Sequence, residues 1–79
     1  MTIANLIETI TKEICDFPND VNVKEITGNT TSIIEIHVNK ADQGKMIGKQ
    51  GRVIQSIRTI VYTICFKDKK RYTIEVIAK

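Results

Sequence analysis

The chain has 79 residues and a mass of 9.0 kDa; 42% of its residues are hydrophobic and 27% are charged. This length allows one small domain over residues 1–79, and its core must be aliphatic, because 15 isoleucines outnumber two phenylalanines and two tyrosines. No apolar run approaches the ~18 residues that a membrane helix needs, and the first residues do not show the basic segment followed by an apolar one that is typical of a secretory signal. We therefore expect a cytoplasmic protein with no membrane partner.

The two halves of the chain carry opposite net charge. Residues 1–42 contain three basic and seven acidic side chains, whereas residues 43–79 contain nine basic and two acidic ones, and the overall net charge is +3. Such polarisation favours a polyanionic partner such as nucleic acid over a membrane surface. A solvated basic face explains the charge about equally well, so the motifs must decide.

Residues that could hold a metal ion or a cofactor are sparse. Cys15 and Cys65 lie 50 positions apart without C-x-x-C spacing, and His37 is the single histidine. We expect free thiols, no metal site and no cofactor. His37 occupies the polar position of an alternating segment, which favours a solvent-facing strand residue over one that titrates or contacts a ligand.

The first half of the chain predicts a helix followed by a hairpin. Apolar residues recur every three or four positions from Thr2 to about Asp16, the pattern of a helix with one buried face. Phe17-Pro18-Asn19-Asp20 ends this helix, because proline disfavours helical geometry at the residue before it. Val21–Thr27 and Ile33–Val38 alternate as strands do, and the turn-forming residues between them predict an antiparallel pair.

The second half predicts two helices and a strand. A short helix should run from about Ala41 to Ile47, broken at Gly48, and a longer one from Arg52 to Phe66 with a wide apolar face. Gly44 costs the short helix ~1 kcal/mol relative to alanine, which suggests that another backbone or a ligand approaches it closely. Tyr72–Ile77 alternates as a strand.

The order helix, strand, strand, helix, helix, strand predicts an α+β fold in two layers. Because the two middle helices connect the second strand to the third, these two strands should be parallel, whereas the hairpin strands are antiparallel. The expected fold is a three-stranded mixed sheet with three helices on one face.

The strongest functional signal is the segment between the middle helices, Met46-Ile47-Gly48-Lys49-Gln50-Gly51-Arg52-Val53-Ile54. Glycines let a backbone turn sharply and approach another backbone closely. The amides that begin the next helix favour an anion, and Lys49 and Arg52 add positive charge there. We interpret the segment as a loop that contacts a phosphate backbone. A tight interhelical turn would explain the glycines, but not the basic residues.

Ile47–Ile54 resembles the I-G-x-x-G-x-x-I signature of KH domains, placed between two helices. The element order is similar to the type II, bacterial form of that domain. Nearly the whole chain resembles the small single-KH RNA-binding proteins of the KhpA family, in its length, in the lead-in Asp42-x-Gly44-Lys45 and in Gly48-Lys49-Gln50-Gly51-Arg52. A G-x-x-G sequence is common by chance, but between two helices with flanking isoleucines it is specific.

The resemblance implies a groove that binds about four nucleotides of single-stranded RNA, with the G-x-x-G loop against their backbone. Gly48 and Gly51 would allow the close approach. Lys49 and Gln50 would meet phosphate or sugar. Arg52 would add charge at the start of the following helix.

Several further residues could extend this RNA-binding surface. Ile47 and Ile54 would form the floor of the groove, although a place in the core explains them equally well. Lys45, Arg58 and the run Lys67–Arg71 would enlarge the electrostatic footprint, and solvated surface is an equal alternative for each.

Tyrosines and catalytic groups give weaker signals. Tyr62 and Tyr72 could stack on bases, but their spacing favours packing in the core. A catalytic function is not expected, since Gly44-x-x-x-Gly48-Lys49 has the wrong spacing for a nucleotide P-loop and lacks the following Ser or Thr. The scattered carboxylates and the one histidine form no recognisable catalytic set.

The resemblance also implies partners. It predicts a homodimer, or a heterodimer with a larger RNA-binding protein that has its own KH module, since pairing two weakly binding modules raises avidity. An RNA chaperone or post-transcriptional regulator fits such a protein. Two alternatives stay open: a KH-fold protein-interaction module with little RNA affinity, and a single-stranded DNA binder.

Overall fold

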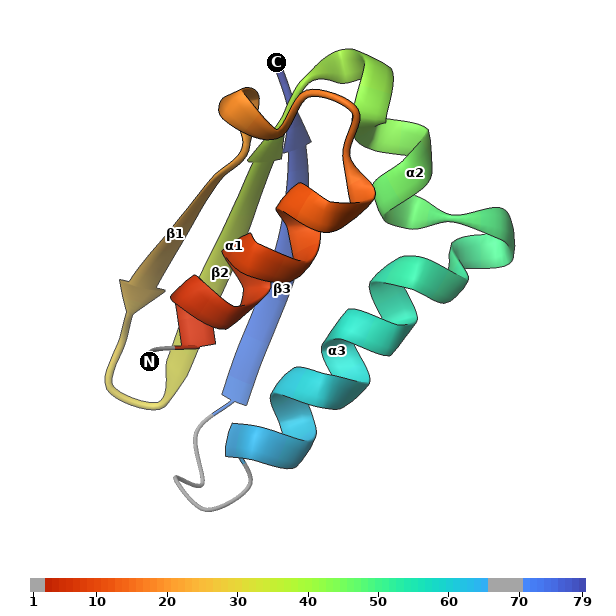
Figure 1. Cartoon of the computed structure of the whole chain (residues 1–79). Coiled ribbons are helices and arrows are strands. Elements are labelled where there is room, and N and C mark those ends of the chain that lie inside the picture. Colours follow the sequence, from red (N-terminus) through yellow and green to blue (C-terminus); the bar gives the residue numbers. More distant parts are fainter. Residues whose placement is uncertain (1–2, 66–70) are drawn as a thin grey trace.

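The structure is a computed structural model that describes residues 3–65 and 71–79. Within these ranges the helices and strands follow the predicted order α-β-β-α-α-β (Figure 1). They are α1 (Ile3–Ile14), β1 (Asn22–Thr27), β2 (Thr31–Val38), α2 (Gln43–Ile47), α3 (Arg52–Cys65) and β3 (Arg71–Ala78), with short 3-10 turns at Pro18–Asp20, Lys40–Asp42 and Lys49–Gly51.

The sheet has the predicted mixed topology, with β2 in the centre. β1 and β2 form an antiparallel hairpin in which Asn22 lies opposite His37. β2 and β3 are parallel, with Ile34 beside Ile74, because the chain crosses back through α2 and α3. This crossover places the segment between α2 and α3 on the β3 side of the molecule (Figure 1).

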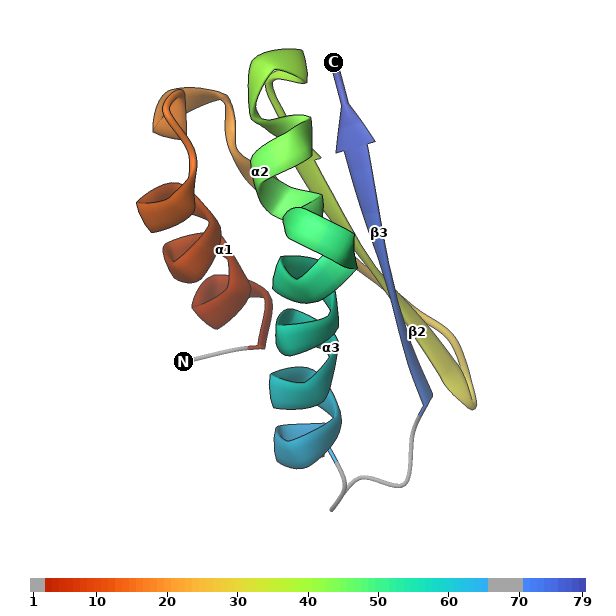
Figure 2. The same ribbon diagram turned by 90° about the vertical axis from the view of Figure 1, so that its right-hand side faces the viewer.

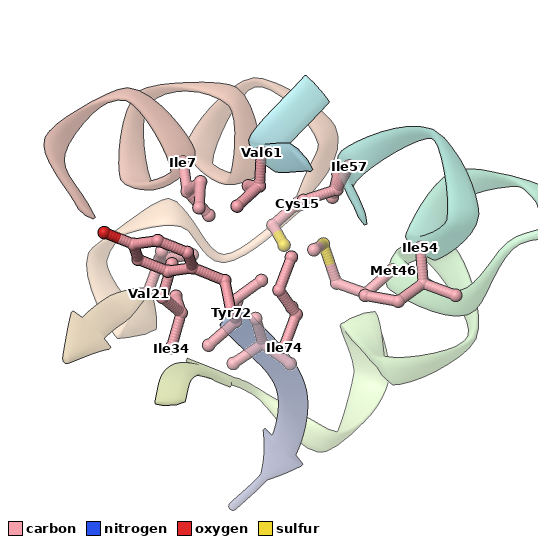
Figure 3. Packing of buried hydrophobic residues seen from close by; sticks show 12 residues of the cluster. Ile7, Cys15, Val21, Ile34, Met46, Ile54, Ile57, Val61, Tyr72 and Ile74 are labelled. Atoms are coloured by element: carbon pink, nitrogen blue, oxygen red, sulfur yellow. The ribbon is translucent and has the colours of Figure 1, made fainter. Parts of the chain in front are cut away.

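All three described helices cover one face of the sheet, as predicted (Figure 2). β2 and β3 direct their even-numbered residues toward the helices, and the apolar stripes of the helices meet them in one aliphatic core (Figure 3). The buried hydrophobic residues of this core are Ile7, Cys15, Val21, Ile34, Ile36, Val38, Met46, Ile54, Ile57, Val61, Tyr72 and Ile74.

Element boundaries differ from the prediction by one or two residues, except where the predicted helix from Ala41 to Ile47 divides. Its first part is a 3-10 turn over Lys40–Asp42, which Asn39 begins by accepting a hydrogen bond from the Ala41 amide at 2.9 Å. Only Gln43–Ile47 is α-helical. The proposed helix start at Thr2 and end at Phe66 lie outside the described residues.

Two side chains lie where the sequence did not place them. The expectation that His37 faces solvent is wrong: it is only 7% exposed, because β2 is central and Asn22 and Ile77 flank it on the two neighbouring strands. Tyr62 is 55% exposed instead of packed in the core, since it lies ~100° around α3 from the buried Val61. Tyr72 is buried, as predicted.

Candidate nucleic-acid interface

Gly48 ends α2 in a conformation that only glycine adopts readily. Its amide donates to the Gly44 carbonyl at 2.8 Å, which closes the last turn of the helix. Its φ of 74° and ψ of 174° lie in a region that is essentially restricted to glycine. A Cβ atom at this position would also lie 2.4 Å from a side-chain carbon of Val53 and 2.9 Å from the Val53 nitrogen. Gly48 therefore lets α2 and α3 meet at a sharp angle.

The rest of the loop is a tight turn in left-handed geometry. Gln50 has a φ of 58° and Gly51 a φ of 73°, and the Arg52 amide donates to the Lys49 carbonyl to start α3. A Cβ at Gly51 would meet no atom within 4 Å among the described residues, so φ alone favours glycine there. The turn directs Lys49 and Gln50 outward, and both are exposed.

The loop stands away from the sheet, beside the start of α3 (Figure 1). The first amides of a helix lack partners within that helix and carry a partial positive charge. Lys49 and Arg52 are exposed at this end of α3. The positive end of the α3 dipole and two cationic side chains are thus close together, an arrangement that suits a phosphate group.

The two isoleucines of the motif have different environments. Ile54, in the first turn of α3, is 8% exposed and belongs to the core. Ile47, the last residue of α2, is 41% exposed. Of the pair, Ile47 is therefore the one with apolar surface available to a ligand.

Lys45 and Arg58, both expected to widen the basic surface, make contacts within the protein. Lys45 forms an ion pair with Asp16, and its hydrogen bond to that carboxylate raises the pKa of the lysine. Arg58 is half-buried and its Nη2 lies 3.5 Å from the Ile74 carbonyl, a long contact. The guanidinium thus lies beside the outer edge of β3.

The backbone groups of β3 point alternately toward β2 and toward the outer edge of the sheet. The amides of Arg71 and Lys79 donate to Thr30 and Val38, so the odd-numbered residues direct their backbone groups toward β2. Ile74 and the other even-numbered residues therefore direct theirs to the opposite edge of β3. This edge lies on the side of α2 and α3 (Figure 1). Of the basic run 67–71 only Arg71 is described; it is exposed and begins β3.

The sequence suggested that another backbone or a ligand approaches Gly44 closely. Within the described residues no other backbone does so. Apart from its chain neighbours and its own helix, no described atom would lie within 4 Å of a Cβ at this position. Gly44 is exposed on α2, so only a bound molecule could require a small residue there.

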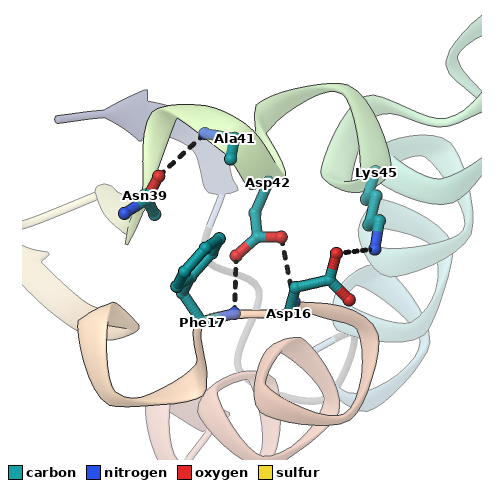
Figure 4. A network of polar contacts seen from close by, with 6 residues as sticks. All are labelled: Asp16, Phe17, Asn39, Ala41, Asp42 and Lys45. Carbon is teal, nitrogen blue, oxygen red and sulfur yellow. Dashed lines mark hydrogen bonds and ion pairs between the residues drawn. The ribbon is translucent and has the colours of Figure 1, made fainter.

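Asp42 is the residue that sequence reasoning missed. It is fully buried, and its two carboxylate oxygens accept hydrogen bonds from the amides of Asp16 and Phe17 at 2.9 and 3.0 Å (Figure 4). These partners are 26 and 25 positions away, so no local pattern identifies them. The lead-in Asp42-x-Gly44-Lys45 was the single hint that this carboxylate matters.

Residues 3–65 and 71–79 contain no metal-binding cluster and no membrane-spanning helix. No group of three or more His, Cys, Asp or Glu side chains in these ranges could hold a metal ion. None of the helices described there is long and apolar enough to cross a bilayer.

A mixed sheet covered on one face by α1, α2 and α3, with a G-x-x-G turn inside the β2–β3 crossover, defines a KH domain of type II. The chain belongs to the KhpA/KhpB KH-domain family, whose model matches residues 4–76.

Similar proteins from several bacteria share most of the chain. An RNA-binding protein KhpA from Caldanaerobacter subterraneus subsp. tengcongensis is 49% identical over 72 residues, which cover 91% of this chain and 96% of the relative. That of Clostridium acetobutylicum is 44% identical over the same shares of the two chains. That of Aquifex aeolicus is 41% identical over 92% of each chain. No solved structure matches with statistical significance.

Proposed function

We propose that this protein binds short single-stranded RNA through the loop of Gly48, Lys49, Gln50 and Gly51. The observation that carries the proposal is the conformation of this loop. Two glycines with positive φ hold Lys49 and Gln50 outward beside the start of α3. The relatives described above are named RNA-binding proteins, which supports RNA as the ligand.

The chemistry of this binding is electrostatic and non-catalytic. The ammonium of Lys49 and the guanidinium of Arg52, both at the positive end of the α3 dipole, would neutralise one or two phosphates. Gln50 would hydrogen-bond to phosphate or sugar. Bases would then lie between the exposed Ile47 and the outward edge of β3, over about four nucleotides.

A single module of this size binds weakly and releases quickly, which suits a protein that acts on many RNAs. We therefore infer a role as an RNA chaperone or post-transcriptional regulator. Such a role needs repeated contact with unpaired segments and no chemical step.

The test is fluorescence anisotropy of a labelled single-stranded RNA pool, titrated with wild type and with the variant Lys49→Asp, Gln50→Asp. We expect the variant to lose binding while its circular dichroism and melting temperature stay close to wild type, because both side chains are exposed. The wild-type affinity should fall with salt, by a log–log slope of about 0.7 for each phosphate contacted.

A matched control distinguishes an effect of the loop residues on RNA affinity from an effect of the overall net charge. The variant Asn22→Asp, Lys24→Asp makes the same change in net charge on β1, on the face of the sheet away from the helices. It should keep most of the RNA affinity. Equal loss in both variants, or a flat salt response, would contradict binding through the loop, and a matched DNA pool tests the single-stranded DNA alternative.

We also propose that the protein pairs with a second KH module, in a homodimer or with a larger KH-containing protein. Ile60 and Ile64, one turn apart on α3, are 39% and 44% exposed. A small domain gains stability when such apolar surface is covered, and two linked modules bind one RNA more tightly than either alone.

A further inference from the structure

The short helix α2 is attached to a distant part of the chain by a buried carboxylate. Asp42 is the residue before α2, where an aspartate usually caps its own helix. Within the described residues it does not do so, since both its oxygens accept the amides of Asp16 and Phe17 just after α1 (Figure 4). The side chain that could cap α2 instead joins α2 to the end of α1.

A second contact joins the same two segments at the surface. Lys45, on α2, forms an ion pair with Asp16. Its side chain and that of Asp16 are largely exposed, so this pair alone contributes little. The buried Asp42 bonds are the stronger contact, because charge-assisted hydrogen bonds in a dry environment exceed solvated ion pairs.

The orientation of α2 depends on these contacts together with Met46, which the helix places in the core. α2 has five residues, one of them Gly44, and a helix this short is not stable without tertiary contacts. Only Gly48 separates its end from Lys49. Any rotation of α2 therefore moves Gly48 and the loop directly.

We propose that Asp42 is a positioning residue for RNA binding, which holds α2 so that the loop of Gly48 to Gly51 keeps its binding geometry. This inference rests on the proposed function of the loop. Asp42 itself is fully buried, so its carboxylate is not available to the RNA. It acts through its hydrogen bonds to the Asp16 and Phe17 amides.

The variant Asp42→Asn tests the proposal through the sign of its effect. It removes a negative charge, which by electrostatics alone strengthens binding to a polyanion. It also turns an NH2 group toward one of the two amides, which loosens α2. We expect an RNA dissociation constant about fivefold higher than that of wild type, within the usual range of coupling between sites.

Asp20→Asn is the matched control. Asp20 is exposed and accepts a hydrogen bond from Asn39 at 3.0 Å, so it lies on the same connector as Asp16 and Phe17 but does not take part in the Asp42 contact. Its loss of charge should leave RNA affinity unchanged or slightly increased. If folded Asp42→Asn binds as tightly as Asp20→Asn, the positioning role is refuted, while loss of binding in Lys49→Asp, Gln50→Asp would still support the loop.

Hydrogen exchange on the wild type decides the matter if Asp42→Asn does not fold. Coupling between two sites is reciprocal. If the Asp42 hydrogen bonds favour RNA binding, bound RNA must therefore stabilise those hydrogen bonds. We expect saturating RNA to slow exchange of the Asp16 and Phe17 amides more than that of exposed β1 amides. Unchanged exchange at Asp16 and Phe17, in a protein that binds the RNA, would overturn the proposal.

Discussion

Gly48 and Gly51 serve the same turn for different physical reasons. At Gly48 a side chain is excluded twice, by the backbone angles and by Val53. At Gly51 the space is open and only the positive φ opposes a side chain. The two glycines of one motif therefore tolerate substitution to different degrees.

We predict that Gly48→Ala destabilises the protein more than Gly51→Ala. The Gly51 variant should lose about 1–2 kcal/mol, the cost of a left-handed alanine. The Gly48 variant should lose more, because a Cβ would also displace Val53 from the start of α3. Urea unfolding of both variants measures the difference, and equal losses would show that Val53 moves freely.

Cys15 is a buried thiol whose surroundings keep it neutral. Burial raises its pKa above the ordinary value of 9.0, and the nearby Asp42 carboxylate raises it further. Because the folded pKa exceeds the unfolded one, the neutral thiol contributes stability in full below pH 9.0. That contribution is lost as the pH rises through the folded pKa.

The prediction is that the stability advantage of Cys15 over alanine shrinks in alkaline solution. Wild type and Cys15→Ala, each with Cys65→Ser, would be compared by urea unfolding between about pH 7 and 10.5. The difference in unfolding free energy should be constant at neutral pH and fall above pH 9.0. A constant difference over the whole range would show that the thiol titrates alike in both states.

At the scale of elements, α2 contains a glycine, Gly44, although the packing of the helix leaves room for a side chain at this position. Gly44→Ala should stabilise the protein by roughly 0.5–1 kcal/mol, because alanine is the better helix former and the position is open. Thermal melting measures this gain. If the same variant binds RNA less well, the glycine serves the ligand; an unstable variant would show that α2 cannot accept a side chain there.

The sequence predicted the elements and their order because each depends on local residues. The 3.6-residue period of α3, the alternation of β2 and the glycines of the loop are all visible within a few positions. The parallel β2–β3 pair then follows from the crossover. The same local logic placed Lys49 and Gln50 in the loop and Arg52 at the start of the next helix, and all three are exposed.

What the sequence could not show depends on contacts between distant segments. Lys45 meets Asp16 across 29 positions, and Asp42 meets Asp16 across 26. His37 is buried by its neighbours on two other strands, whereas alternation reports only the face of one strand. Such pairings become visible only once the sheet and helices are placed.

At the scale of the whole molecule, the two charged halves of the chain form different helices and strands. The acidic half forms α1, β1 and β2, whereas the basic half forms α2, α3 and β3. The loop and the exposed Ile60 and Ile64 both belong to the basic half. A dimer formed through α3 would therefore join two basic surfaces on one RNA.

We predict that Ile60→Lys weakens self-association without unfolding the domain, because Ile60 is partly exposed already. Sedimentation velocity over a range of concentrations measures the effect. Tyr62→Lys is the control, since Tyr62 is more exposed and lies ~160° around the helix from Ile60. A wild type that stays monomeric at high concentration, or equal effects of both variants, would exclude this surface.

The parallel pairing of β2 and β3 has a consequence for how the protein is made. Thr27 and Ser32 pair across a short hairpin turn, but Thr31 pairs with Arg71, 40 positions later. Bringing together residues that are 40 positions apart costs more chain entropy than forming the hairpin. We therefore expect the hairpin to form early and β3 to pair with β2 last. On the ribosome, α2, the loop and α3 would emerge before the strand that anchors them. A nascent chain should therefore acquire RNA affinity only after β3 has left the exit tunnel.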